Sequence, residues 1–364
     1  MMDVIFNLFK IRFNIMDELF SANDINLTRS DKVNIFINLE SVLRKLHRSN
    51  LEVYLKVKKD EKIFEFVSNI LNLAAHYRLY FSKQKIYSKV YIYLGYPFKS
   101  KYKNNNFIEE YRKYYQERFS KNTKNVSFSN LFEDVMGISK TILEYIEGVY
   151  IINSNSIEPS VIPYILMKDK DDNFKNFIVT TDRYEYQYVD KDFYILRPKK
   201  ELSYIITKDN VINQMKIEEK INSDLSVDSS YISFILSILG NKYRNIKHIK
   251  RIGLSTLIKL IRTAIDNNIL GEQTNNIYLL SKIIKDEYKE IFLNNYYCTD
   301  LDYQIKYLNI VDIHSITDQI KDKFDNASLN KLNNDYFNTY PIMLLELTSA
   351  VNLIKKKKDI FLGR

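Results

Sequence analysis

Four short apolar runs, spread over the first two hundred residues, constrain the fold of this chain more than any other feature. They occupy residues 31–38, 89–95, 149–153 and 177–181, and they are rich in Val, Ile, Tyr and Phe. Such runs are typical of buried strands. The stretches 39–47, 131–146 and 160–167 between them have helical spacing. Strands that alternate with helices predict an α/β domain with a mostly parallel sheet.

From about Asp209 onward the pattern becomes helical, without a convincing strand. Apolar residues recur at three-to-four spacing in 231–239, 253–265, 277–292 and 340–356. An α/β half therefore precedes an all-helical half. Ligands of parallel sheets bind at the carboxyl ends of the strands, which directs attention to Asn38, Leu94, Ile152 and Asp182.

The charge balance points to an anionic partner. The 364 residues carry a net charge of +9, with 45% hydrophobic and 27% charged residues, as in a globular protein. Lysine and asparagine are also favoured by an AT-rich genome, such as that of a virus or mobile element, so the placement of the cations decides more than their number.

The single cysteine, Cys298, excludes an intrachain disulfide or a thiolate metal cluster and favours a reducing, intracellular (cytoplasmic) setting. In its helical context Cys298 is expected in the core. The N-terminal residues 1–20 intersperse apolar residues with charges, which excludes a membrane span. We expect an amphipathic helix that packs on the protein body, with a membrane-surface role as the alternative.

The segment 234–260 has the pattern of a helix, a glycine-containing turn and a second helix that grips a DNA backbone. No Asp or Glu occurs between Gly240 and Arg262. Gly253 allows close approach of a phosphate, and the first turn of the next helix, with Ser255 and Thr256, would point its amides at it. Alternatively, Gly253 only caps a turn between core helices. The cations of the segment are Lys242, Arg244, Lys247, Lys250, Arg251, Lys259 and Arg262, beside His248.

A second basic segment, 96–124, interleaves cations with aromatic residues. Cations suit phosphates and aromatic faces suit unstacked bases, so single-stranded DNA is one expected ligand. The alternative is a solvated helix packed on the protein, because acidic residues dilute its charge. The cations that we single out here are Lys101, Lys103, Arg112 and Arg118.

Five ordered landmarks make the chain resemble the flap endonuclease and bacteriophage 5′-nuclease superfamily. They are the strand ending at Asn38, IYLG with Gly95 before Tyr102-Lys103, IEPSVIPYIL, IVTTDRYEYQYV, and GNKYRNI followed by IGLSTL. The resemblance implies an N-terminal extension 1–30 and a PIN-like α/β domain 31–208 with an arch at 97–126. It further implies a helical DNA clamp of helix-turn-helix type at 209–290 and a helical C-terminal region 291–364.

The resemblance also implies a cluster of carboxylates that holds two divalent metal ions, since hard cations prefer oxygen ligands. Only Glu158 and Asp182 remain acidic. The other family positions hold Asn38, Leu94, Ser160, Val161, Tyr184, Asn241 and Arg244. Two-metal hydrolysis is therefore not expected.

Either no metal or a single Mg²⁺ or Mn²⁺ is expected at Glu158 and Asp182, with Glu40 or Glu185 shifted into place. Alternatively, the two carboxylates cap the helices that follow them or pair with Arg183.

These expectations describe a protein that binds duplex, forked or flap DNA without cutting it, in viral replication, repair or recombination. Replication or transcription proteins would be partners, and no membrane is involved. Two alternatives stay open: an active metal-dependent 5′-nuclease that uses Glu158 and Asp182, and a scaffold that acts through protein contacts alone.

Overall fold

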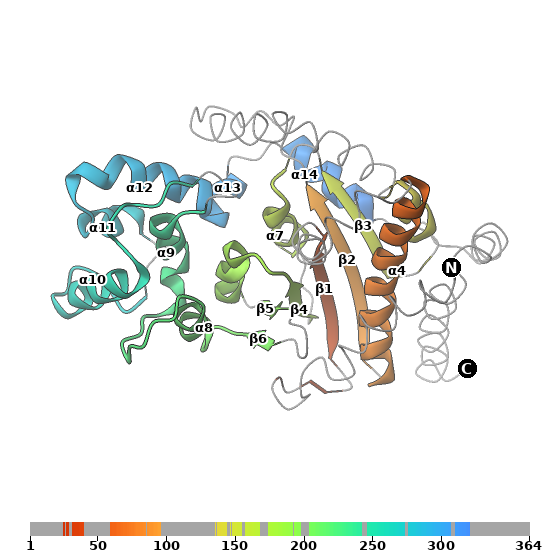
Figure 1. Ribbon diagram of the computed structural model, residues 1–364, viewed down its shortest axis with the longest axis horizontal. Helices are drawn as coiled ribbons and strands as arrows, with labels where there is room; N and C mark the ends of the chain where they lie inside the picture. Colours follow the sequence, from red (N-terminus) through yellow and green to blue (C-terminus); the bar gives the residue numbers. More distant parts are fainter. Residues whose placement is uncertain are drawn as a thin grey trace.

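A six-stranded sheet forms the centre of the computed structural model, in the order β3-β2-β1-β4-β5-β6 (Figure 1). Strands β1 to β5 are parallel, and only β6 is antiparallel to its neighbour. The prediction of a mostly parallel sheet in an α/β domain is confirmed. The structure describes residues 25, 27–28, 31–39, 59–84, 86–95, 135, 137–143, 146, 148–154, 157–167, 174–191, 193–197, 204–241, 246–273, 276–306 and 310–320.

The four predicted runs are all strands, with shifted ends. The strands are β1 Lys32–Asn38, β2 Tyr87–Gly95, β3 Val149–Ser154, β4 Phe174–Val179, β5 Phe193–Arg197 and β6 Tyr204–Ile206. Strand β4 ends at Val179, so Asp182 lies in the turn beyond it. Strands β5 and β6 were not predicted, because both are short and lie among polar residues.

Alternate residues of the strands supply the two cores of the sheet. Val33, Ile35 and Ile37 of β1 pack with α4 (Lys59–Lys83) on one face. Phe36 points to the opposite face, where it stacks on Tyr91 and shares a core with α7 (Ile162–Met167). Burying an aliphatic side chain of this size is worth roughly 1.5–3 kcal/mol, so both faces hold the sheet in register.

The edge strand β3 is contacted by residues from the C-terminal part of the chain. Helix α14 (Ile310–Thr317) contacts β3 and α7. The Gln319 side chain accepts from Asn153 N and donates to Asn153 O, both at 3.0 Å. A side-chain amide thus occupies the position of a neighbouring strand, which blocks pairing with another chain.

The second half is helical in the described residues, as predicted. Its helices are α8 Val211–Glu218, α9 Ile232–Leu239, α10 Leu254–Asp266, α11 Ile277–Lys282, α12 Asp286–Thr299 and α13 Leu301–Lys306. The prediction of one helix at 277–292 was wrong, because Lys285 is extended and a new helix starts there. Asp286 and Glu287 favour that start, since carboxylates stabilise a helix N-terminus.

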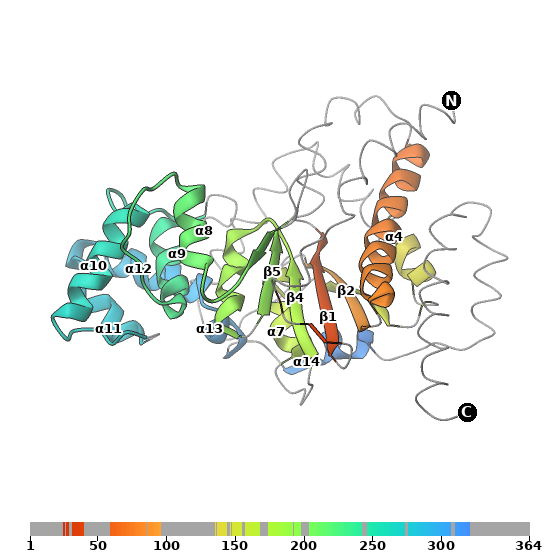
Figure 2. The same cartoon turned by 90° about the horizontal axis from the view of Figure 1, so that it is seen from below.

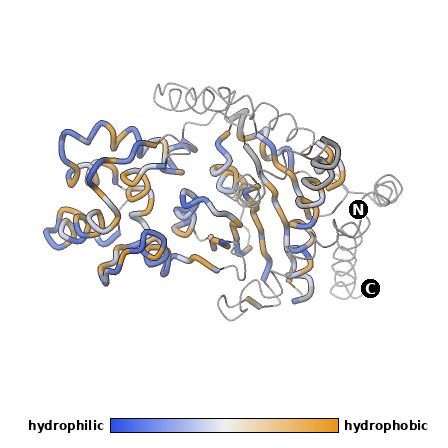
Figure 3. The backbone as a smooth tube through the Cα atoms, viewed as in Figure 1, coloured by the Kyte–Doolittle hydropathy of each residue, from blue (hydrophilic) through white to orange (hydrophobic). Residues whose placement is uncertain are grey.

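One continuous core joins the two halves. It runs from Phe36 and Tyr93 of the sheet through Tyr184 to Leu257 and Phe292 of the helices. Figures 1 and 2 show the helices α8 to α12 at one end of the molecule and the sheet at the other, with the 3₁₀ segment η2 (Arg183–Lys191) between them. In Figure 3 the strands carry long hydrophobic stretches, and the outer turns of the helical part are mainly hydrophilic.

Several expectations fall on residues outside the described ranges. These are the N-terminal helix at 1–20, most of the predicted helix 39–47, the basic segment 96–124 and the helix 340–356. Within the ranges that are described, no helix combines the length and the apolar character that crossing a bilayer requires.

Candidate functional site

Glu185 lies at the carboxyl ends of the central strands, buried completely in the first turns of η2. Its Oε1 accepts hydrogen bonds from Asn38 Nδ2 at 2.9 Å and from the Tyr93 hydroxyl at 2.5 Å. Asn38 and Tyr93 are register partners on β1 and β2. The parallel pairing therefore brings a carboxyl, an amide and a phenol to one point.

Burial and, to a smaller extent, the nearby charge of Asp182 raise the pKa of Glu185, and hydrogen bonds from Thr180, Tyr93 and Asn38 act against this, so that the pKa is about 7. Burial together with the Glu185 charge raises the pKa of Tyr93 well above its usual value. Near neutral pH the carboxyl is therefore close to half protonated and serves as a hydrogen-bond partner of the strand ends.

Asp182 caps the turn that it precedes. Its Oδ1 accepts a hydrogen bond from Tyr184 N at 3.0 Å, and its own N–H donates to Thr180 Oγ1 at 3.0 Å. The capping interpretation is confirmed for Asp182. Arg183 forms ion pairs with Glu218 and Glu219 of the helical half.

Glu158 follows β3 and is buried, with 6% of its surface exposed. It precedes the 3₁₀ turn Pro159–Val161, but its side chain forms no capping hydrogen bond there. The capping interpretation is therefore wrong for Glu158. Burial and, to a smaller extent, the Glu158 charge raise the pKa of Cys298 to about 12; this thiol is half-buried and packs against the core, and its raised pKa disfavours the nucleophilic thiolate.

Three positions that the resemblance assigns to acids hold buried groups of other kinds. Val161 is part of the core, and the backbone oxygen of Ser160 accepts a hydrogen bond from Tyr188. The Tyr184 hydroxyl donates to Cys298 O at 2.8 Å, away from the strand ends. In the part of the chain that the structure describes, no three His, Cys, Asp or Glu side chains lie close enough to hold a metal ion. The donor set fits two divalent metals poorly.

The second predicted site, residues 240–253, is folded back onto the end of α9. Helix ends leave carbonyl groups without partners in the helix, and here each of the last four carbonyls has a donor. Three of the donors come from beyond the helix. The pairs are Leu236 O with Gly240 N (2.9 Å), Ser237 O with Asn295 Nδ2 (2.8 Å), Ile238 O with Ile249 N (2.9 Å) and Leu239 O with His248 Nδ1 (3.0 Å).

The described residues 246–253 include both buried anchors and exposed cations. Ile246 and Ile249 are buried in the core that joins the two halves. The cations Lys247, Lys250, Arg251 and, on α10, Lys259 are exposed. Since the anchors fix the backbone, these cations face solvent from a defined surface, which we name the cationic loop (residues 240, 241 and 246–253 with the first two turns of α10).

Other predicted cations have different environments. Arg262 forms an ion pair with Glu272 at 3.1 Å, so its charge is opposed, contrary to the unopposed charge that the local sequence indicates. The backbone of Asn241 pairs with Ile246 in an isolated antiparallel bridge. Lys242 and Arg244 lie outside the described residues, as do Lys101, Lys103, Arg112 and Arg118.

The two glycines of the loop differ in what requires them. Gly240 has φ +69°, and an added Cβ would come within 2.6 Å of the backbone at Ile246 and His248. Gly253 has extended backbone angles, and an added Cβ would meet nothing within 4 Å. The fold therefore requires glycine at 240 only.

Helix α10 presents its N-terminus at Gly253. Its first intrahelical bond runs from Leu257 N to Gly253 O, and no side chain caps the start. Leu254 and Leu257 are buried, Ser255 is half-buried and Thr256 is exposed. The amides of the first turn thus lie beside exposed Gly253, where an anion is favoured.

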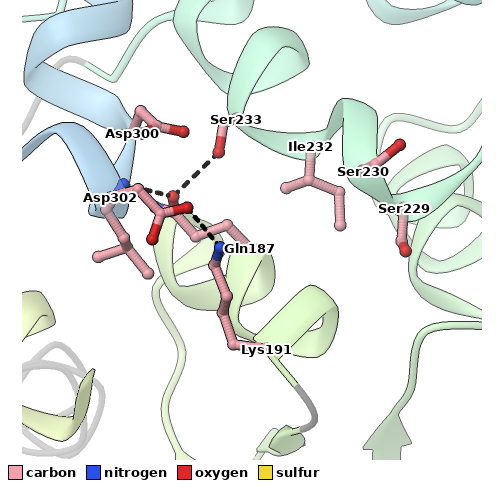
Figure 4. Close-up of a pocket in the computed structure, with 9 residues that line it drawn as sticks. Gln187, Lys191, Ser229, Ser230, Ile232, Ser233, Asp300 and Asp302 are labelled. Carbon is pink, nitrogen blue, oxygen red and sulfur yellow. Dashed lines mark hydrogen bonds and ion pairs between the residues drawn. The ribbon is translucent and has the colours of Figure 1, made fainter. Parts of the chain in front are cut away.

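The strand-end turn is bonded to the helical half through a polar notch (Figure 4). Gln187 of η2 donates to Thr299 O at 3.1 Å and accepts from Ser233 Oγ at 3.1 Å and from Leu301 N at 3.2 Å. Lys191 and Asp302 form an ion pair across the same notch. No local pattern in the sequence indicates this junction, because these partners of Gln187 lie 46 to 114 residues away along the chain.

The fold and these residues define the general class: an α/β sheet protein with carboxyl groups at the strand ends and a helical second half that carries the cationic loop. No family model matches the sequence, and no curated protein matches it significantly. Solved structures similar to it include those of the bacteriophage T5 5′-exonuclease, also named a flap endonuclease.

The T5 5′-exonuclease with bound zinc is 15% identical, with a TM-score of 0.49, and the match covers 84% of this chain and 99% of that chain. The T5 flap endonuclease in a pseudo-enzyme–product complex with DNA and metal ions is 14% identical, with a TM-score of 0.49 and coverage of 85% and 100%. At these values the likeness concerns the general course of the chain alone.

Proposed function

We propose that this chain is a DNA-binding protein built on a 5′-nuclease type of fold, which binds duplex or branched DNA through the cationic loop and does not hydrolyse it. Under this proposal residues 31–208 form the α/β body, 209–290 the clamp and 291–364 a helical support. The zinc, metal ions and DNA named for the T5 structures belong to those proteins.

The observation that carries the proposal is the cationic loop. Lys247, Lys250, Arg251 and Lys259 are exposed on a backbone held by buried anchors, and no acidic residue occurs from 240 to 265. A rigid display of cations beside a helix N-terminus suits the regular spacing of a phosphate backbone. Gly253 supports the same proposal, because nothing in the fold requires glycine there.

The absence of hydrolysis is proposed from the donors that are present. Glu185 is shared between Asn38 and Tyr93, Asp182 caps its own turn, and Val161 and Tyr184 are turned into the protein interior. Two-metal hydrolysis needs several carboxylates that share two cations about 4 Å apart. Each of these groups has a structural role instead.

A single-metal nuclease is the second candidate, and one observation favours it. Glu185 is a third carboxyl beside Asp182 at the strand ends, close enough for the two charges to interact. One Mg²⁺ or Mn²⁺ bound by Asp182 and Glu185 would have to displace the hydrogen bonds from Asn38 and Tyr93. Glu158 could join them only after a rearrangement, because no three such side chains of the described residues lie close enough to hold a metal ion.

The proposal is tested by fluorescence anisotropy with labelled single-stranded, duplex, forked and 5′-flap DNA of equal length, each titrated at several salt concentrations. We expect saturable binding of duplex-containing DNA that weakens steeply with salt. Affinity that does not change with salt would support the scaffold alternative and contradict phosphate binding.

A further inference from the structure

The cationic loop is attached to α12 through one buried side chain. Asn295, with 6% of its surface exposed, lies on α12 and donates through Nδ2 to Ser237 O at 2.8 Å and to Lys247 O at 2.6 Å. Ser237 is at the end of α9, and Lys247 is the first exposed cation of the loop. A single amide therefore ties both ends of the turn to a third helix.

An asparagine suits this position because an amide nitrogen has two N–H groups that can reach two carbonyls at once. Both acceptors are backbone groups in a protein interior, where a carbonyl without a donor is costly. The anchors Ile246 and Ile249 hold the loop through buried side chains and through backbone hydrogen bonds to Asn241 and Ile238, and Asn295 adds the bond that holds the Lys247 carbonyl.

The same turn of α12 also holds the strand-end turn. Thr299 Oγ1 donates to Asn295 O at 2.7 Å, and Thr299 O accepts from Gln187 of η2. The Tyr184 hydroxyl donates to Cys298 O in the same turn. Hydrogen bonds thus run without interruption from the carboxyl-bearing turn, through the end of α12, to the cationic loop.

We propose that Asn295 is the positioning residue of the cationic loop: it touches no DNA, but it fixes the Lys247–Arg251 backbone on α12 at a set place relative to the α/β body. This inference rests on the proposed function, since it names what orders the DNA-binding surface. Its structural part, the fixing of the loop, stands on the hydrogen bonds alone.

The test compares Asn295→Ala with Asn294→Ala, its half-buried neighbour on α12, in the full chain. Hydrogen exchange is measured at Ile246 and Ile249, whose amides are bonded to Asn241 O and Ile238 O. In Asn295→Ala we expect the exchange rate of these two amides to rise at least about tenfold, while the exchange rate of the strand amides stays unchanged. In Asn294→Ala we expect unchanged exchange rates both at these two amides and in the strands.

The second arm measures affinity for the DNA that the wild type binds best, as a function of salt. We expect Asn295→Ala to bind about tenfold more weakly with an unchanged slope of log K against log salt, because the phosphate contacts persist once the loop is ordered. A residue that contacts phosphate directly would instead lower the slope. A reduced slope in Asn295→Ala therefore overturns the positioning role.

Unchanged exchange at Ile246 and Ile249 in Asn295→Ala would overturn the positioning role, whatever the DNA affinity of the variant. Faster exchange in a chain whose wild type binds no DNA would uphold the positioning role and reject the proposed function. If Asn295→Ala does not fold, it is replaced by Asn295→Ser, which keeps one hydroxyl donor. Exchange at Ile246 and Ile249 that is faster than in the wild type would then support the positioning role, and exchange at the wild-type rate would overturn it.

Discussion

The strand-end site, formed by Asn38, Tyr93 and Glu185, buries its charged residue, whereas the cationic loop exposes its charged residues. At the strand ends the carboxyl of Glu185 is fully buried and its oxygen is occupied by Asn38 and Tyr93. In the loop the apolar residues are buried, and Lys250 and Arg251 are exposed. Under the proposed function, a DNA-binding surface and a strand-end site depend on different residues of one fold, so the first can be kept while the carboxyl of the second serves the packing.

The largest effect should come from reversing charge in the cationic loop. The double variant Lys250→Glu with Arg251→Glu should weaken DNA binding by about 100-fold or more near 0.1 M salt, because two phosphate contacts are lost and two repulsions added. Anisotropy titrations give the affinity. The matched control is Lys208→Glu with Lys306→Glu, both exposed and outside the loop. An equal loss in the control would mean that net charge, and not this surface, binds DNA.

The pH dependence of the free energy of unfolding tests whether the carboxyl of Glu185 is part of the buried core. The folded state holds the Glu185 proton up to pH about 7, while the unfolded chain releases it near 4.5. The stability that this proton contributes is thus complete below pH 4.5 and is lost as the pH rises to about 7.

Relative to the wild type, Glu185→Gln should therefore gain about 3 kcal/mol of unfolding free energy between those two pH values, measured by urea unfolding. Glu290→Gln, at an exposed carboxylate on α12, serves as the control. Parallel pH dependences of the wild type and Glu185→Gln would contradict a buried, proton-holding carboxyl.

Alanine substitution of the two glycines of the loop, Gly240 and Gly253, distinguishes an effect on stability from an effect on DNA binding. Gly240→Ala should destabilise the protein by at least about 2 kcal/mol, because of its positive φ and the close backbone at Ile246 and His248. Gly253→Ala should leave stability within about 0.5 kcal/mol but weaken DNA binding. Thermal unfolding and anisotropy distinguish the two. Unchanged DNA affinity in Gly253→Ala would favour the interpretation of Gly253 as an ordinary turn residue.

The smallest effect concerns one cation at the rim of the loop. Lys259→Ala should weaken binding modestly and reduce the slope of log K against log salt by about 0.9, the value for one phosphate contact on duplex DNA. Arg262→Ala is the comparison, since its partner Glu272 already opposes its charge. Equal changes of slope in both variants would show that the ion pair does not set the role of Arg262.

How far the sequence predicts this molecule depends on whether the signal is local. The strands β1 to β4 were found because alternating apolar residues mark them, and the cationic loop because its glycines and cations are neighbours in sequence. Helix α4 was missed although its buried Val67, Leu71 and Ala74 have helical spacing. That signal was available.

The pairings that define the sites were not available locally. Glu185 meets Asn38 and Tyr93 only because parallel strands place residues 147 and 92 positions apart at one edge. Asn295 reaches Ser237 and Lys247 across 58 and 48 positions. The positions where the resemblance expects carboxylates could be counted from the sequence, but the contacts of the residues that stand there could be found only from the packing.

DNA binding without cleavage is tested by incubating one labelled 5′-flap DNA with saturating protein and Mg²⁺ or Mn²⁺, and by measuring the fraction bound and the fraction cleaved in the same samples. We expect the wild type and Asp182→Ala both to bind the DNA and neither to form product. Product that forms with the wild type and disappears with Asp182→Ala would show that the protein is a nuclease.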